Sequence, residues 1–130
     1  MKPITIICSE GIIRDGDSNQ ITLYNLVEEI NAISFPVFIH KFSIFLLVEK
    51  EESDPENSNI ILKILNNERE LFTQSIKTDF KGKKRMRTNI HLGGLAVFEV
   101  GDIIIQFNYN ESFFCDYKIP AILIPSAKTE

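Results

Sequence analysis

Residues 102–119 read DIIIQFNYNESFFCDYKI, with apolar and polar side chains in alternation on either side of a short polar break. Before the break, the apolar members of the alternation are Ile103, Ile105, Phe107 and Tyr109. After it they are Phe113, Cys115, Tyr117 and Ile119. Successive side chains on a strand point to opposite faces of the sheet, so each half predicts a strand with one buried row and one solvated row. The stretch predicts a hairpin that turns at Asn110 and Glu111.

The same alternation continues through most of the chain and predicts eight strands. Besides the two in the hairpin, they are residues 4–13, 20–29, 37–48, 59–65, 70–78 and 86–98. Gly93 and Gly94 lie inside the last of these and suggest a bulge or kink. Residues 23–33 also fit the spacing of a short helix, so a helix is the alternative there.

The predicted fold class is all-β: an antiparallel two-layer β-sandwich of seven to nine strands with Greek-key-like crossovers. A chain of 130 residues is long enough for one domain with its own core. Residues 1–130 are therefore expected to form a single β-sandwich domain, with 121–130 as a tail that is disordered at its end.

Composition and charge narrow the classes of function. The chain is 44% hydrophobic and 25% charged, which is typical of a globular protein. Its net charge of −4 argues against nucleic acid as a partner. The longest uncharged run, Phe42–Val48, is too short to span a bilayer. Two cysteines and an N-terminus that reads as a strand, not a signal peptide, predict a cytoplasmic protein with reduced thiols.

The predicted strand 37–48 is apolar on both faces. Phe45 and Leu47 lie on the face opposite Phe42 and Ile44, and only one face can point into a two-layer core. The other face needs a cover, which could be the N-terminal segment, residues 120–125 or another subunit. A symmetric homodimer is expected, because such dimers are the commonest closed assembly.

Three stretches in the first half of the chain suggest a family. They are Cys8-Ser9-Glu10-Gly11-Ile12-Ile13-Arg14-Asp15, then residues 21–29, then Phe35-Pro36. This order resembles the N-terminal half of a group of small bacterial β-sandwich proteins that are catalogued only as a domain of unknown function. The resemblance implies the sandwich fold and implies no activity.

No pattern in the sequence predicts catalysis, a metal site or a cofactor. A Ser or Cys nucleophile needs a base within hydrogen-bond reach, and the chain has only His40 and His91. Cys8 and Cys115 both fall on predicted buried faces, where a thiol packs as a small apolar group. Four scattered His and Cys residues do not form a zinc pattern, and no phosphate-binding or dinucleotide motif is present. We therefore expect a protein that is not an enzyme.

Two charged segments stand out. Residues 49–56 are rich in glutamate, and they either bind a cation or form a solvated loop. The solvated loop fits better, because calcium loops favour Asp, Asn and Gly.

Residues 81–87 carry five basic side chains and no acid. The candidate residues for binding an anion or a partner are Lys83, Lys84, Arg85, Arg87 and His91, the last three sharing the outer face of strand 86–98. The alternative is a solvated edge whose lysines prevent strand-to-strand aggregation.

The sequence thus favours a non-catalytic interaction module that binds a protein partner or itself through a sheet face or edge. The alternative is an anion- or nucleotide-binding domain that uses residues 81–91, since guanidinium groups match phosphate and carboxylate.

Overall fold

The computed structural model describes residues 1–125, and these form eleven strands and no helix. The all-β prediction is confirmed, whereas the predicted range of seven to nine strands is too low. The helical alternative for residues 23–33 is wrong, because that stretch contains the end of β2 (Ile21–Leu26) and all of β3 (Ile30–Ala32).

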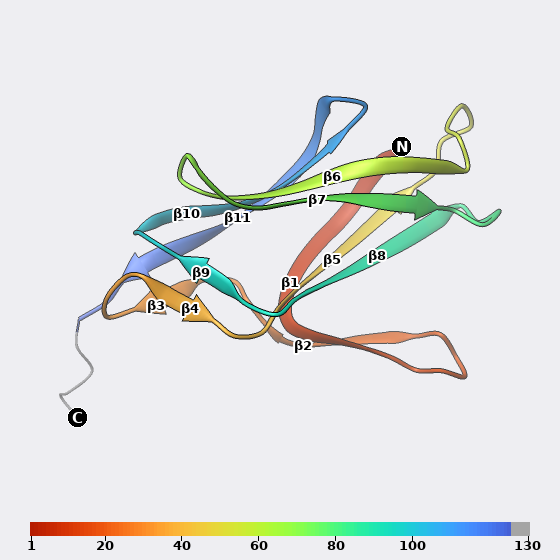
Figure 1. Cartoon of the computed structure of the whole chain (residues 1–130). Coiled ribbons are helices and arrows are strands. Elements are labelled where there is room, and N and C mark those ends of the chain that lie inside the picture. The colour runs from red at the N-terminus through yellow and green to blue at the C-terminus, as the bar shows by residue number, and fades with distance from the viewer. Residues whose placement is uncertain (126–130) are drawn as a thin grey trace.

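The strands form three sheets (Figure 1). A four-stranded sheet has the order β2-β1-β5-β8, with β1 at Lys2–Arg14, β5 at Phe42–Glu49 and β8 at Arg85–Leu92. A five-stranded sheet has the order β3-β11-β10-β6-β7, with β6 at Asn57–Asn66, β7 at Arg69–Asp79, β10 at Gly101–Tyr109 and β11 at Ser112–Leu123. The third sheet pairs β4 (Val37–Ile39) with β9 (Leu95–Val97). β3 runs parallel to β11, so the prediction of antiparallel pairing is wrong for that pair.

Two predicted strands are each divided in the structure. Residues 37–48 separate into β4 and β5 around the exposed pair His40 and Lys41, and residues 86–98 separate into β8 and β9 at Gly93 and Gly94. The Phe38 ring occupies the space that a Cβ on Gly94 would need. β4 and β9 therefore leave the four-stranded sheet and pair with each other. The alternating pattern did not show these two breaks, so it predicted too few strands.

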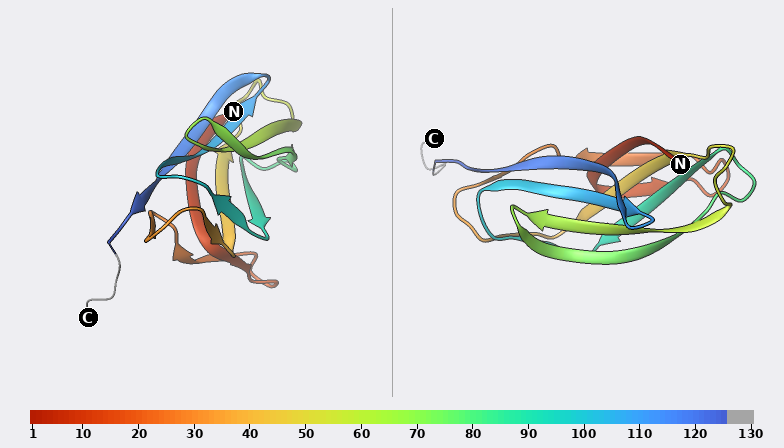
Figure 2. Two further views of the ribbon diagram at one scale, coloured as in Figure 1. Left: turned by 60° about the vertical axis from the view of Figure 1, so that its left-hand side comes forward. Right: turned by 90° about the horizontal axis from the view of Figure 1, so that it is seen from above.

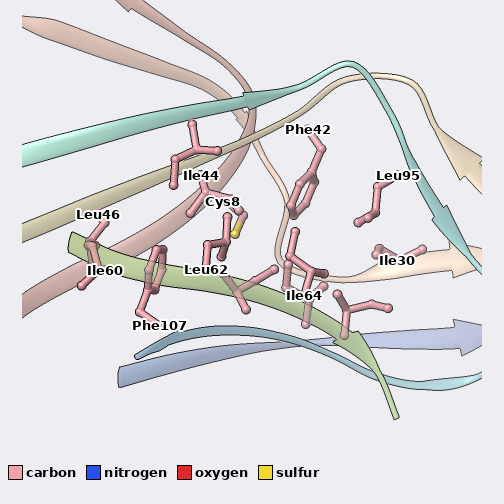
Figure 3. Packing of buried hydrophobic residues seen from close by; sticks show 14 of the residues in the cluster. Cys8, Ile30, Phe42, Ile44, Leu46, Ile60, Leu62, Ile64, Leu95 and Phe107 are labelled. Atoms are coloured by element: carbon pink, nitrogen blue, oxygen red, sulfur yellow. The ribbon is translucent and has the colours of Figure 1, made fainter. Parts of the chain in front are cut away.

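The core lies between the four-stranded and five-stranded sheets, which form two layers in Figure 1. It draws on Cys8 in β1 and on the inward rows of β5, β6, β10 and β11 (Figure 3). The fully buried side chains include Phe42, Ile44, Leu46, Ile60, Leu62, Ile64, Ile103, Ile105, Phe107 and Ile119. Alternation predicts the inward rows of β6 and β10 correctly, since a strand with one wet face exposes every second residue.

The hairpin of β10 and β11 turns at Asn110 and Glu111, as predicted. Both residues have positive φ, which suits a two-residue turn between antiparallel strands. The register shifts after Phe107, so that Cys115 opposes Phe107 while Phe113 opposes Asn108. This bulge moves Phe113 to the outer face, where it is 60% exposed, and the prediction that Phe113 is buried is wrong.

The prediction of a tail over residues 121–130 is wrong at its start. β11 continues through Pro120 to Leu123, because Ala121–Leu123 pair with β3. The predicted disorder at the end of the tail falls on residues 126–130, which lie outside the described residues.

The second apolar face of β5 is covered from within the chain. Phe45 is 8% exposed and Ser43 2%, although both lie on the face opposite the core. β1 bends after Ser9, and its second half runs with β2 beneath β5 and β8 (Figures 1 and 2). Arg87 on β8 donates a hydrogen bond to the backbone carbonyl of Asn19 in this hairpin. The N-terminal segment is thus the cover.

Candidate functional site

The predicted basic residues all lie along the turn after β7 and along β8. Lys83 and Lys84 are in the turn, and Arg85, Arg87 and His91 follow on one face of β8. Ile90 is buried, while Arg85 and His91 are exposed and Arg87 is half-buried. The alternation predicted for this strand is confirmed, so the three β8 side chains share the outer face.

The side chains on β8 already have partners inside the molecule. Arg85 Nε lies 3.0 Å from Glu49 Oε1, and this hydrogen bond lowers the pKa of the Glu49 carboxyl. Arg87 holds the β1–β2 hairpin through Asn19. His91 Nδ1 lies 3.1 Å from Ser43 Oγ. Lys83 and Lys84 are exposed in the turn that precedes β8.

The acidic segment 49–56 lies beside the basic turn, which the sequence did not predict. The backbone N–H of Gly82 donates to Glu56 Oε2 at 2.9 Å, and the N–H of Lys50 donates to the carbonyl of Lys84 at 2.7 Å. Lys83 and Lys84 line a shallow hollow of about 600 Å³ together with Glu49, Glu51, Glu52 and Glu56. Antiparallel pairing of β5 with β8 brings the two segments to one end of the sheet, where their opposite charges face each other.

The basic segment 81–87 also borders a second hollow, and the charged residues that line this one are mostly cationic. This hollow of about 370 Å³ is lined by Lys81, Lys83, Arg85 and Arg87. Asp79 is the one carboxylate among its lining residues, and Leu47, Phe80 and Met86 supply apolar surface. Four basic groups against one acid make this the part of the segment best suited to an anion.

The acidic loop is held by the N-terminus. The Met1 amino group lies 2.5 Å from Asp54 Oδ2 and 3.1 Å from Glu51 Oε1. The hydrogen bond from this amino group lowers the pKa of the Asp54 carboxyl, with the N–H of Glu51 adding to the effect. Within residues 1–125, no group of three or more His, Cys, Asp or Glu side chains is placed to hold a metal ion.

One pair of side chains has the spacing of a nucleophile and a base. Ser43 and His91 are hydrogen-bonded, and cross-strand pairing of β5 with β8 brings them together. Ser43 is only 2% exposed beneath the hairpin, so its hydroxyl does not face a substrate. A nucleophile must reach the substrate, so this pair has a structural role in packing the hairpin.

The two thiols are both free, and their surroundings differ. Cys8 is buried in the core, as predicted, and burial raises the pKa of its thiol to about 12. Cys115 lies on the inward face, as predicted, and packs against the core, but it is only half-buried; burial raises its pKa to about 11, with the Asp116 charge adding to the shift. The thiolate is the reactive form, and both sites disfavour it.

Exposed apolar side chains gather at one end of the molecule. The register pairs Gly101 with Ala121, which places Val100 beside Ile122, and pairs Leu123 with Ala32, which places Ile33 next to them. Phe98 lies in the same connection as Val100. We call this group the apolar end: Ile33, Phe98, Val100, Ile122 and Leu123, whose exposed fractions range from 36% to 58%. Alternation within single strands could not predict it, because its members come from three separate segments.

No protein-family model, no curated protein and no solved structure matches this chain. Among residues 1–125 there is no helix with the length and apolar character needed to cross a membrane.

Proposed function

We propose that the chain is a non-catalytic interaction module whose apolar end binds a second copy of the same chain. The observation that carries the proposal is that five exposed apolar side chains, from the segment after β3, the connection before β10 and the end of β11, lie at the same end of the five-stranded sheet. Exposed apolar side chains are costly in water, and where several lie at one end of a soluble protein they indicate an interaction site.

A second copy suits this surface for a reason of symmetry. A two-fold interface places the same patch against itself, so a patch of one chemical character is compatible with its own image. The apolar end consists of Ile, Leu, Val and Phe, and the Arg69 guanidinium is taken up by stacking 4.4 Å from the centre of the Phe98 ring. None of the five side chains is charged, and the exposed Glu99 between Phe98 and Val100 is the nearest carboxylate in sequence. The other strongly exposed segment, 81–87, would repel its own copy.

The test compares two isoleucines of equal exposure. Ile33, in the apolar end, is 58% exposed, and Ile13, in the β1–β2 hairpin, is 57% exposed. Ile33→Glu puts two carboxylates into the dimer interface and should weaken dimerisation at least about tenfold, which corresponds to about 1.4 kcal/mol. Ile13→Glu should leave dimerisation unchanged. Sedimentation equilibrium across micromolar concentrations measures both variants and the unmodified chain.

A monomer at every concentration of the unmodified chain would refute self-association. Equal weakening by Ile33→Glu and Ile13→Glu would refute the apolar end as the interface. Neither substitution should affect folding, because exposed changes alter stability by about half a kcal/mol or less.

The anion-binding alternative has an observation of its own in the cationic hollow of Lys81, Lys83, Arg85 and Arg87. Lys81 and Lys83 are exposed and can be changed without removing the Glu49 pair or the hairpin contact. Pyrophosphate binding that falls steeply with added salt and is lost in Lys81→Ala/Lys83→Ala would favour this function. Lys118→Ala, an exposed lysine on the five-stranded sheet, is the control.

Three further predictions stay proposals. The two stacked sheets and the connections that cross between them, β5 to β6 and β7 to β8, support a two-layer sandwich with Greek-key-like crossovers. The kinship with small bacterial sandwich proteins of unknown function rests on the first half of the sequence. Cytoplasmic location rests on the two free cysteines, which suit a reducing compartment.

A further inference from the structure

The outer face of the five-stranded sheet carries a polar hollow that none of the functions above uses. Its volume is about 610 Å³, and it lies where the start of β6 meets the turn between β10 and β11. Four asparagines line it: Asn57 and Asn59 from β6, and Asn108 and Asn110 from β10 and its turn. Asn108 is half-buried, and the other three are exposed.

The register places apolar surface among these amides. Ile61 pairs with Asn108 on one side and with Ser75 on the other, and Asn108 in turn pairs with Phe113. One row across four strands therefore reads Ser75, Ile61, Asn108, Phe113. Ile61 is 39% exposed and Phe113 60%, so this row presents an aliphatic group and an aromatic ring at the level of the asparagine side chains.

The lining selects a neutral ligand rich in hydroxyl groups. Each asparagine amide offers two N–H donors and a carbonyl acceptor, which can bind a pair of neighbouring hydroxyls by donating to one and accepting from the other. An anion would instead need Lys or Arg, and Glu111 is the one charged residue among those that line the hollow. A sugar ring also has an apolar C–H face, which can pack on Ile61 in the lining or on Phe113, which lies outside the lining as the cross-strand neighbour of Asn108.

We propose that this hollow binds a neutral oligosaccharide, with Asn59 and Asn108 bonding its hydroxyls and Phe113 packing against a sugar ring. Its volume lies in the range of small-molecule sites, roughly 300–1,000 Å³. The site belongs to the opposite sheet from the basic segment and does not include the apolar end. Saccharide binding is therefore independent of self-association.

The probes are six-sugar chains of β-linked glucose, α-linked glucose, β-linked N-acetylglucosamine and α-linked mannose. Each is titrated into the isotope-labelled full chain while the backbone and asparagine side-chain amide signals are followed by NMR. One of the four should shift the signals of Asn59, Asn108 and Asn110 with an affinity in about the millimolar range. Asn59→Ala/Asn108→Ala should weaken that affinity at least tenfold, and Phe113→Ala should weaken it as well.

The matched control is Asn89→Ala, an exposed asparagine on the outer face of β8, which should leave the affinity unchanged. No shift with any of the four probes would overturn the proposal, as would shifts of equal size in the double variant. Tighter binding of a sugar phosphate than of the parent sugar would overturn the neutral ligand class. Tighter binding of an uncharged extended peptide than of any saccharide would overturn the saccharide itself.

Discussion

Asn66 is a polar side chain that is completely buried at the end of β6. Its Oδ1 accepts hydrogen bonds from the N–H groups of Phe98 and Glu99, at 2.9 and 3.0 Å, and its Nδ2 donates to the carbonyl of Glu99 at 3.2 Å. Every polar atom of the amide is thus satisfied, which a buried polar group requires. The side chain fixes the connection that carries Phe98 and Val100 of the apolar end.

Asn66→Ala should lower the free energy of unfolding by about 2–3 kcal/mol. The change removes three hydrogen bonds and leaves backbone groups of residues 98 and 99 without partners, at about 1 kcal/mol for each bond lost. Urea denaturation measures the loss. Asn67→Gly is the control, because the neighbouring Asn67 is exposed, makes one such bond and has a positive φ that glycine tolerates. A loss no larger for Asn66→Ala than for Asn67→Gly would contradict the role of Asn66.

The hairpin of β1 and β2 is the element that shapes the outer face of the four-stranded sheet. Beyond Ser9, β1 no longer pairs with β5, and it pairs with β2 alone. Three contacts attach this hairpin to the sheet: Arg87 to the carbonyl of Asn19, Ser43 Oγ to the carbonyl of Glu10 at 3.4 Å, and Val27 N–H to the carbonyl of Cys8 at 2.8 Å. Only the first lies near its tip, so the hairpin depends on Arg87 to stay closed.

Arg87→Ala should let the hairpin open locally while the core stays folded. Amide hydrogen exchange in residues 12–23 should accelerate by about tenfold or more, because local openings follow the stability of the local contacts. Exchange in β6 and β10 should not change. Mass spectrometry of exchanged peptides measures both regions. Arg87→Lys, which keeps a donor, should show a smaller acceleration, and uniform acceleration over the whole chain would show that Arg87 supports global stability instead.

At the scale of the whole molecule, stability should depend on pH at both ends of the range. The thiols of Cys8 and Cys115 have pKa values of about 12 and 11, against an ordinary value of 9.0. The unfolded chain releases these protons at lower pH than the folded chain does. The free energy of unfolding is therefore unaffected below about pH 9 and falls as the pH rises toward 12, by up to about 1.4 kcal/mol per pH unit for each thiol.

At acidic pH the free energy of unfolding changes in the opposite direction, and it falls as the pH is lowered. Hydrogen bonds lower the pKa values of Asp15, Glu49 and Asp54, with Ser18, Arg85 and the Met1 amino group as the first donors. The stability they add is present above the ordinary carboxyl range and is lost as the pH falls through their lowered pKa values. Asp15 is exposed, and Glu49 and Asp54 are half-buried at the surface, where ion pairs contribute little, so stability should fall only gradually as the pH drops.

Urea denaturation at a series of pH values measures the fall in stability at both ends of the range. Cys8→Ala should make the alkaline fall less steep, because Cys8 is the more deeply buried thiol. An alkaline slope that is the same in Cys8→Ala and in the unmodified chain would show that other groups cause the fall.

The pattern of apolar and polar residues was enough to predict the all-β class and which side chains share a face in the regular strands. Ile60, Leu62 and Ile64, like Ile103, Ile105 and Phe107, are buried where alternation predicts them, because strand geometry alone sets which side chains share a face. It also placed Arg85 and His91 on the outer face of β8, and it located the turn between β10 and β11. These features depend on neighbours within a few residues along the chain.

The contacts that those faces make depend instead on how distant strands pair. The bulge after Phe107 turned Phe113 outward, and the bend in β1 covered Phe45 with the chain's own hairpin. Pairing of β5 with β8 put the acidic segment against the basic turn, and the register of β6 and β10 gathered the four asparagines. Each of these contacts joins segments far apart in sequence. The alternation of apolar and polar residues within a strand carries no information about which strands pair or in which register. Both proposed binding surfaces, the apolar end and the asparagine-lined hollow, depend on such pairings.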